Sequence, residues 1–180
     1  MEKNTHVAKY ITKLLRHDPE ELVMDKNGWV DVKSLISKLN ITKNTLDYIV
    51  SNDNKSRMTY DPSETKIRAN QGHSIEVDVE LEEVIPPEFL FNGTSSAVVD
   101  IIMEEGLKKM TRNHVHLSTD IETATTVGDR HTKSASKTTV ILKVKSKEMS
   151  DDGYKFYLSK NGVYLIDHVP SKYLIIDTWK

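Results

Sequence analysis

The pattern of apolar residues changes along the chain, and this change constrains the fold more than any other feature. Up to about residue 52 apolar residues recur at the spacing of amphipathic helices, whereas after residue 138 they form short extended runs. The acidic segment 74–88 ends in Pro86-Pro87, a composition typical of a linker. The sequence therefore predicts an α+β protein with one lobe over residues 1–78 and a mixed β lobe over residues 85–180.

The first lobe is predicted to contain three helices followed by a hairpin. The first helix begins near Thr5 and ends at Arg16-His17, because Asp18 precedes a proline and the residue before proline avoids the α region. Asp31 and Thr42 are placed to cap the second and third helices. Segments 57–60 and 66–68 flank a turn and predict two paired strands. This order of elements is that of a winged-helix domain.

The second lobe is predicted to be mostly β with two short helices. A strand at 89–91 leads into a polar turn at 92–96, and a helix over 98–103 is expected to end at Gly106. Residues 114–118 alternate polar and apolar side chains and predict a strand, followed by a helix that Thr119 or Asp120 could cap. The remaining apolar runs predict strands.

Composition excludes several classes of protein. The chain has 180 residues, of which 37% are apolar and 29% charged, and no apolar run approaches the length of a membrane span. It contains no cysteine, which excludes disulfides, thiolate catalysis and cysteine-bound zinc. The N-terminal residues lack the apolar core of a signal peptide. We therefore expect a cytoplasmic protein that does not associate with a membrane. We also expect a monomer.

The charge distribution argues against a broad nucleic-acid-binding surface. The net charge is −2, and residues 1–78 hold 12 basic and 12 acidic residues. This balance leaves room for a local basic pocket only.

Arginine is rare in this chain, and most of it lies near histidine. Only five of the 25 basic residues are arginine, and four of these have a histidine within five positions. In a lysine-rich sequence, sites that keep arginine plausibly need its planar fork or its permanent charge. These sites are Arg16-His17, Arg68 with His73, Arg112 with His114 and His116, and Arg130-His131.

The segment 68–74, with sequence RANQGHS, is rich in hydrogen-bonding groups and has almost nothing to bury. Its arginine suits a phosphate or a carboxylate, and Gly72 lets the backbone approach another group closely. A polar loop closing a hairpin is the ordinary alternative.

Six motifs together resemble the NAD-dependent RNA 2′-phosphotransferases, which remove the 2′-phosphate left at a tRNA splice junction. They occur in the family's order and at similar spacing over essentially the whole chain. The motifs are LRH at 15–17, RANQGHS at 68–74, NGT at 92–94, RNHVHLS at 112–118, VGDR at 127–130 and SKNGV at 159–163. The resemblance implies an N-terminal winged-helix lobe joined to an ADP-ribosyltransferase-like lobe.

The resemblance also implies a reaction in two steps, with NAD as co-substrate and 2′-phosphorylated RNA as substrate. The RNA 2′-phosphate attacks the nicotinamide ribose and expels nicotinamide, giving a 2′-phospho-ADP-ribosylated RNA. The ribose 2″-hydroxyl then attacks the phosphorus, which releases 2′-hydroxyl RNA and ADP-ribose 1″,2″-cyclic phosphate. A phosphate monoester already carries about −1.5 to −2 charge at neutral pH, so it needs no general base.

Residue roles follow by similarity. The catalytic set is Arg16, His17 and Arg68, which would hold the phosphate, together with Arg130, which would matter most in the second step. The substrate-binding residues are Gln71, His73 and Ser74. The residues lining the NAD pocket are Asn92, Gly93, Thr94, Arg112, His114, His116 and Ser118.

The sequence departs from the family pattern at one position. Family members usually carry histidine where this chain has Asn92, and that histidine contacts a ribose hydroxyl of NAD in related transferases. Because asparagine can also donate or accept a hydrogen bond, we expect weaker NAD binding. Val163 stands where protein-modifying relatives place a catalytic glutamate, which makes activation of a neutral acceptor unlikely.

Other interpretations remain for single residues. Arg16 could simply complement the dipole at a helix end, and His114 and His116 share a strand face that could hold a metal, although no third ligand has a telling spacing and we expect none. Gly93-Thr94 most often forms only a turn. Arg57 and His6 are assigned to the surface, Trp29 and Trp179 to packing, and His131 and His168 to no role.

Two other functions compete with the phosphotransferase. One is a winged-helix nucleic-acid-binding protein without catalysis, which the single lysine in the third helix disfavours. The other is an ADP-ribosyltransferase acting on another acceptor, such as a different phosphorylated molecule.

Overall fold

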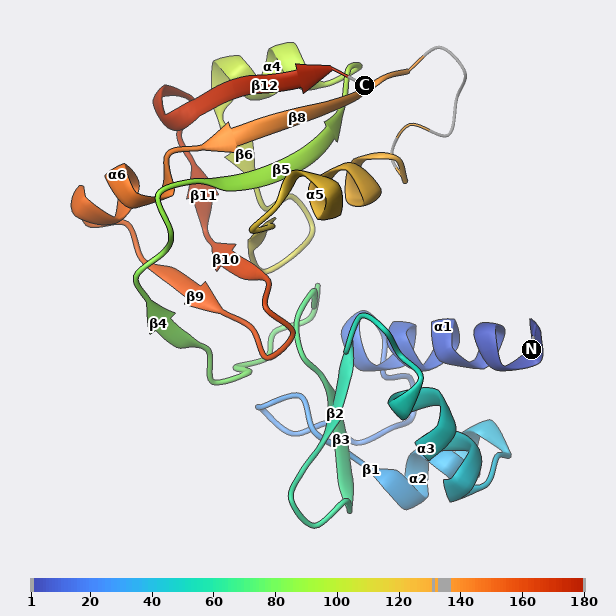
Figure 1. Ribbon diagram of the computed structural model, residues 1–180. Helices are drawn as coiled ribbons and strands as arrows, with labels where there is room; N and C mark the ends of the chain where they lie inside the picture. The colour runs from blue at the N-terminus through green and yellow to red at the C-terminus, as the bar shows by residue number, and fades with distance from the viewer. Residues whose placement is uncertain (1, 131, 133–136, 180) are drawn as a thin grey trace. The chain divides into compact units, whose positions relative to one another are not determined.

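The computed structural model of the protein describes residues 2–130, 132 and 137–179 and divides the chain into two compact units (Figure 1). The first unit comprises Met1–Leu81 together with the short segment Thr111–Asn113. The second comprises Glu82–Met110 and His114–Lys180. The α+β class predicted from the sequence is confirmed. No helix among the described residues is both long and apolar enough to cross a membrane.

The first unit contains the predicted helices and hairpin. Its helices are α1 (Glu2–Arg16), α2 (Val32–Leu39) and α3 (Lys43–Ser51). Its three-stranded antiparallel sheet has the order β1 (Val30–Asp31), β3 (Lys66–Ala69) and β2 (Met58–Tyr60). Both predicted caps are confirmed: Asp31 accepts a hydrogen bond from Ser34 N at 2.8 Å, and Thr42 accepts one from Thr45 N at 3.1 Å.

The apolar face of α1 fixes where this helix ends in space. Ile11, Leu14 and Leu15 are fully buried in the core of the first unit, together with residues of the other helices and of the sheet. Arg16 lies away from this apolar face, because successive helix residues point about 100° apart, so its partial burial comes from the segment 70–74 that packs on the helix end. The amide of Ser74 donates to the carbonyl of Arg16 at 3.0 Å, which holds the segment 70–74 against the helix end.

The second unit is built mainly from two antiparallel sheets. One has the order β12 (Leu174–Trp179), β8 (Thr139–Val144) and β5 (Leu90–Ser95), which lie side by side in Figure 1. The other has the order β4 (Glu82–Val84), β9 (Phe156–Leu158), β10 (Tyr164–Ile166) and β7 (Val115–Leu117). A short pair is formed by β6 (Leu107–Lys108) and β11 (His168–Val169).

Three α-helices and one 3₁₀ turn accompany these sheets in the described part of the unit: α4 (Val99–Glu105), α5 (Ile121–Gly128), α6 (Ser146–Asp151) and η1 (Ser171–Tyr173). Gly106 ends α4 as predicted, and α5 is capped by Asp120, one of the two residues predicted as possible caps. Helix α6 was not predicted, because only Ser146 and Met149 are buried and so short a buried face gives no helical periodicity.

Three sequence predictions about this unit are wrong. Residues 92–94 were expected in a turn but lie inside β5, where Asn92, Gly93 and Thr94 pair with residues of β8. Strand β4 lies within the predicted linker, because pairing with β9 rather than its own apolar content makes it a strand. Trp179 was expected to pack but is 55% exposed on β12.

Position 93 of strand β5 requires glycine for a steric reason. Helix α5 packs so closely on β5 that a Cβ at Gly93 would lie 1.8 Å from the carbonyl oxygen of Ala124, a backbone atom that cannot move aside. On the helix side, a Cβ at Gly128 would lie 2.6 Å from the Thr139 methyl group. The contact between helix and strand therefore requires glycine at both positions.

We predict that Gly93→Ala lowers the free energy of unfolding of the protein by about 2–4 kcal/mol, because the helix must move off the strand. The matched control is Gly153→Ala, since Gly153 has a φ of +92° but open space around its Cβ position. That control should cost only about 1 kcal/mol, the cost of a left-handed conformation. Chemical denaturation of both variants measures the difference, and equal losses would contradict the steric explanation.

Candidate active site

Arg16 is the most unusual polar residue of the first unit. It is half-buried at the end of α1, and its Nε and Nη2 atoms are buried. Neither atom has a hydrogen-bond partner among the residues that the structure describes. Buried guanidinium nitrogens without acceptors are costly, and native proteins keep them mainly where a ligand completes the bonds. The unsatisfied nitrogens therefore favour a ligand-binding role for Arg16 over a role in complementing the helix dipole.

Two residues of the predicted segment 68–74 contact Arg16 and His17. Gly72 has a φ of +86°, and a Cβ there would come within 3.4–3.5 Å of the Arg16 guanidinium. The backbone therefore lies close to the guanidinium, in a conformation that favours glycine. The Ser74 hydroxyl lies 3.0 Å from His17 Nδ1 and fixes the orientation of the imidazole. Three of the predicted residues, Arg16, His17 and Ser74, are thus brought together.

The same segment is anchored on its other side by Asn70. The amide Nδ2 of Asn70 donates to the carbonyl of Ser56 at 2.6 Å, and its backbone amide donates to the carbonyl of Arg57 at 2.8 Å. Arg57 is not a simple surface residue, as the sequence suggested, because it is half-buried and pairs at 2.5 Å with the buried carboxylate of Asp53. The spacing of four residues between Asp53 and Arg57 could have indicated this pair.

A third segment reaches the site from a distant part of the sequence. Asn113 donates its backbone amide to the carbonyl of His73 and its side-chain amide to the carbonyl of Ile75, both at 3.0 Å. These two bonds explain why Thr111–Asn113 belongs to the first unit. Sequence reasoning assigned no role to Asn113. His73 itself is buried, and Gln71 is half-buried.

The charges of the site shift the pKa values of both residues at the end of α1. Burial, followed by the nearby charges of Arg57 and Arg112, lowers the pKa of Arg16 to about 10. Arg16 therefore still carries its charge at neutral pH. Burial, followed by the charges of Arg16 and Arg112, also lowers the pKa of His17. Both shifts come first from burial and then from neighbouring positive charges, and a bound anion would offset both by favouring the charged forms.

Arg68 makes a different set of contacts in the same unit. It is only 5% exposed, and its guanidinium lies 4.4 Å above the ring of Trp29. Its Nη1 donates to the carbonyl of Asn27 at 3.2 Å and lies 3.3 Å from the carboxylate of Glu80. Arg68 Nε is buried without a hydrogen-bond partner among the described residues. Trp29 packs against this arginine, as its assignment to packing anticipated.

In the second unit, β5 and β7 bring most of the predicted NAD-pocket residues side by side. Phe91 and Ser118 exchange backbone hydrogen bonds of 2.8 Å, and the Asn92 side-chain amide donates to the carbonyl of His116 at 3.1 Å. His114 precedes β7, and burial is the main cause that lowers its pKa. The imidazole of His114 is therefore uncharged at neutral pH. Arg112 is the one predicted NAD-pocket residue that lies in the first unit.

Arg130 lies in the second unit, two residues beyond the end of α5. Its backbone amide donates to the carbonyl of Val127 at 3.3 Å, and the preceding Asp129 accepts a 2.6 Å hydrogen bond from the Thr139 hydroxyl. The Arg130 side chain is exposed. Its neighbour His131 lies outside the described residues. The exposed His168 has its ring 5.8 Å from that of Tyr154.

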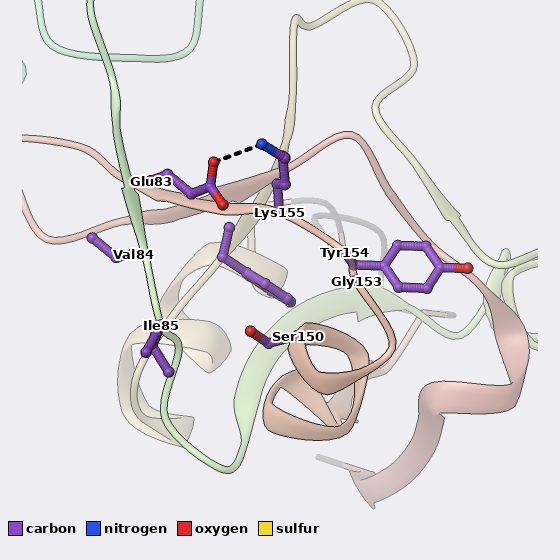
Figure 2. Close-up of a pocket in the computed structure, with 8 residues that line it drawn as sticks. Glu83, Val84, Ile85, Ser150, Gly153, Tyr154 and Lys155 are labelled. Atoms are coloured by element: carbon purple, nitrogen blue, oxygen red, sulfur yellow. Dashed lines mark hydrogen bonds and ion pairs between the residues drawn. The ribbon is translucent and has the colours of Figure 1, made fainter.

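A cavity of about 330 Å³ also lies in the second unit, and none of the predicted site residues lines it. Figure 2 shows it beside β4, β9 and the end of α6, with the carboxylate of Glu83 facing the ammonium of Lys155. These two groups are 2.9 Å apart. Because the two charged lining residues satisfy each other, this cavity offers little for binding an anion. The described residues contain no group of three or more potential metal ligands.

Desolvated arginine nitrogens beside a histidine are the features expected of a protein class that binds phosphate-like anions. Comparison with known proteins gives the family: residues 2–168 match RNA 2′-phosphotransferase, Tpt1 / KptA family. The chain therefore belongs to the RNA 2′-phosphotransferase family.

Several relatives of nearly equal length carry the name probable RNA 2′-phosphotransferase. That of Fusobacterium nucleatum subsp. nucleatum is 45% identical, over 97% of this chain and 99% of its own. That of Trichormus variabilis is 47% identical, over 96% of both chains. That of Streptomyces coelicolor is 42% identical, over 96% of this chain and 95% of its own.

We predict that His17 takes up a proton when the site binds an anion. In the free protein its pKa is depressed, so the imidazole is neutral at pH 7. A phosphate near Arg16 would reverse the local field and raise the pKa of His17. NMR titration of the imidazole with and without inorganic phosphate measures this change, and the exposed His6 on the same helix reports the general effect of salt. An unchanged His17 midpoint at saturating phosphate would contradict the site.

Proposed function

We propose that this protein removes the 2′-phosphate from RNA with NAD as co-substrate. The observation that carries the proposal is the buried guanidinium of Arg16, whose Nε and Nη2 have no acceptor among the described residues. A phosphate monoester offers three acceptor oxygens and about −1.5 to −2 charge, which match these donors. Membership of the RNA 2′-phosphotransferase family supports the same assignment.

We further propose that the two units are a winged-helix lobe and an ADP-ribosyltransferase-like lobe, corresponding to residues 1–78 and 85–180. The order of three helices and a hairpin in the first unit, and the antiparallel sheets of the second, support this. The catalytic set proposed from the resemblance spans both units, with Arg16, His17 and Arg68 in the first and Arg130 in the second.

The proposed role of the first unit is to position the phosphate. Arg16 would bind phosphate oxygens with a fork that keeps its charge at neutral pH, because its pKa of about 10 is still well above 7. His17, held by Ser74, would donate to the phosphate once the anion favours the imidazolium. Arg68, placed by Trp29, would contribute a second fork, for which the exposed Glu80 must release Nη1. Fixed donors of this kind lower the barrier by orientation and by stabilising phosphoryl charge.

The polar residues on β5 and β7 suit a dinucleotide, which needs donors and acceptors for ribose hydroxyls and a carboxamide. Asn92 and Thr94 stand on one strand, and His114, His116 and Ser118 lie on or beside its neighbour. Because Asn92 donates its amide to the carbonyl of His116, its Oδ1 is the atom left to accept from a ribose hydroxyl. When bound, NAD would supply an activated ribose carbon with nicotinamide as leaving group.

Two other functions were considered. The nucleic-acid-binding protein is disfavoured because Lys43, the one basic residue of α3, is 2.5 Å from Asp47 and 3.3 Å from Glu64. Its charge is thereby largely neutralised. An ADP-ribosyltransferase acting on another phosphorylated acceptor would use the same residues, so only the substrate distinguishes it.

The test of the proposed function uses a short RNA with one internal 2′-phosphate. We expect loss of this phosphate only in the presence of NAD, with release of nicotinamide and of ADP-ribose 1″,2″-cyclic phosphate. Chromatography of the RNA and of the nucleotide products measures both. Folded protein that leaves the RNA unchanged with NAD would overturn the proposal, and transfer of ADP-ribose to another phosphorylated acceptor would then identify the alternative.

Substitutions of Arg68 and Arg130 should distinguish the two steps of the reaction. We predict that Arg68→Ala abolishes nicotinamide release, because the phosphate loses a fork that positions it for attack. Arg130→Ala should instead let 2′-phospho-ADP-ribosylated RNA accumulate, since this residue would act mainly in the second step. Rapid-quench gel analysis follows both species. Full turnover by Arg68→Ala would refute the role assigned to it.

A further inference from the structure

The segment Thr111–Asn113 lies between strands of the second unit in sequence but belongs to the first unit in space. Strands β6 and β7 flank it. The two hydrogen bonds of Asn113 to the carbonyls of His73 and Ile75 hold it beside Ser74. Ser74 in turn bonds to Arg16 through its backbone and to His17 through its hydroxyl. A continuous set of short contacts therefore links the backbone next to Arg112 with the end of α1.

The charge of Arg112 acts on the phosphate-binding residues. It contributes to lowering the pKa of both Arg16 and His17. Arg57 also acts on Arg16, but its charge is paired with Asp53 at 2.5 Å. Arg112 itself is exposed. Its side chain is therefore accessible from solvent, whereas that of Arg57 is half-buried.

We propose that Arg112 is a substrate-binding residue that contacts the phosphates of the RNA, and not a residue of the NAD pocket as the resemblance suggested. The geometry carries this assignment, because the peptide that follows Arg112 is bonded to the segment that contacts Arg16 and His17. The inference rests on the proposed function, since it names a further residue of the same phosphate site. Its chemistry is recognition of phosphate oxygens, on either the 2′-phosphate or the adjacent phosphodiester.

An exposed arginine in this position suits the task for two reasons. A monoester carries nearly two negative charges, and Arg112 would add a permanent charge close to Arg16 while His17 is still neutral. The planar fork of Arg112 can also bind two phosphate oxygens at once, which lysine cannot do. Arg16 and His17 at the end of α1 would then bind the phosphates together with Arg68 and with Arg112 of the segment 111–113.

The test compares Arg112→Gln and Arg112→Lys with Lys33→Gln, which removes one exposed charge from α2 of the same unit. Binding is measured without NAD, by calorimetry, to a short RNA with one internal 2′-phosphate. We expect Arg112→Gln to weaken this binding roughly ten- to hundredfold, Arg112→Lys to weaken it less, and Lys33→Gln to leave it unchanged. The KM for RNA should rise with little change in the KM for NAD.

Two further ligands identify which phosphate is bound. The same RNA without the 2′-phosphate reports contact with the phosphodiester, and uridine 2′-phosphate reports contact with the monoester. The NMR titration of His17 supplies a readout that is independent of activity: loss of the positive neighbour in Arg112→Gln should raise the pKa of His17 in the free protein.

The outcomes separate the inference from the proposed function. If wild-type protein neither binds nor dephosphorylates the 2′-phosphorylated RNA, the proposed function fails and the inference fails with it. If the wild type does both, but Arg112→Gln raises the KM for NAD and leaves RNA binding unchanged, the inference alone is overturned and Arg112 returns to the NAD pocket. Full RNA binding by Arg112→Gln with an unchanged KM for NAD overturns it as well.

Discussion

The proposed phosphate site depends on one costly arrangement, the burial of an arginine at the end of a helix without acceptors for its Nε and Nη2 among the described residues. The apolar face of α1 anchors the helix through Ile11, Leu14 and Leu15, and the segment 70–74 covers Arg16 at its end. The lowered pKa of Arg16 reflects this cost, while Ser74 and Gly72 hold the surrounding backbone in place. A ligand that supplies negative charge and oxygen acceptors would remove the cost, so the site is built for binding before the ligand arrives.

Close approach of backbone atoms is the second constraint, and glycine allows it in each unit. At Gly72 the absent side chain lets the chain pass within contact distance of a guanidinium. At Gly93 it lets α5 lie directly on β5, which fixes the end of the helix that leads to Arg130. A methyl group at Gly93 would collide with backbone, whereas at Gly72 it would meet only the flexible end of a side chain, so strain there comes mainly from the positive φ.

Ion pairing between neighbouring side chains determines which charges of the chain still act on their surroundings. The first 78 residues are neutral overall, yet the end of α1 experiences enough positive charge to shift two pKa values. Ion pairs such as Asp53 with Arg57 and Asp47 with Lys43 neutralise the charges of their members locally. The overall charge of a lobe therefore says little about its capacity to bind a phosphate, whereas the positions of a few arginines say much.

The sequence alone determined the features that depend on neighbouring residues: the caps Asp31, Thr42 and Asp120, the end of α4 at Gly106, and the clustering of arginine with histidine. Capping and turn chemistry act within a few residues, so a local pattern suffices to predict them. Only the tertiary structure decided that residues 92–94 form a strand, that Glu82–Val84 pairs with β9, and that Thr111–Asn113 joins the first unit. These outcomes depend on hydrogen bonds and steric contacts between residues far apart in the chain, such as Asn113 with His73 and Gly93 with Ala124, which no local pattern of side chains encodes.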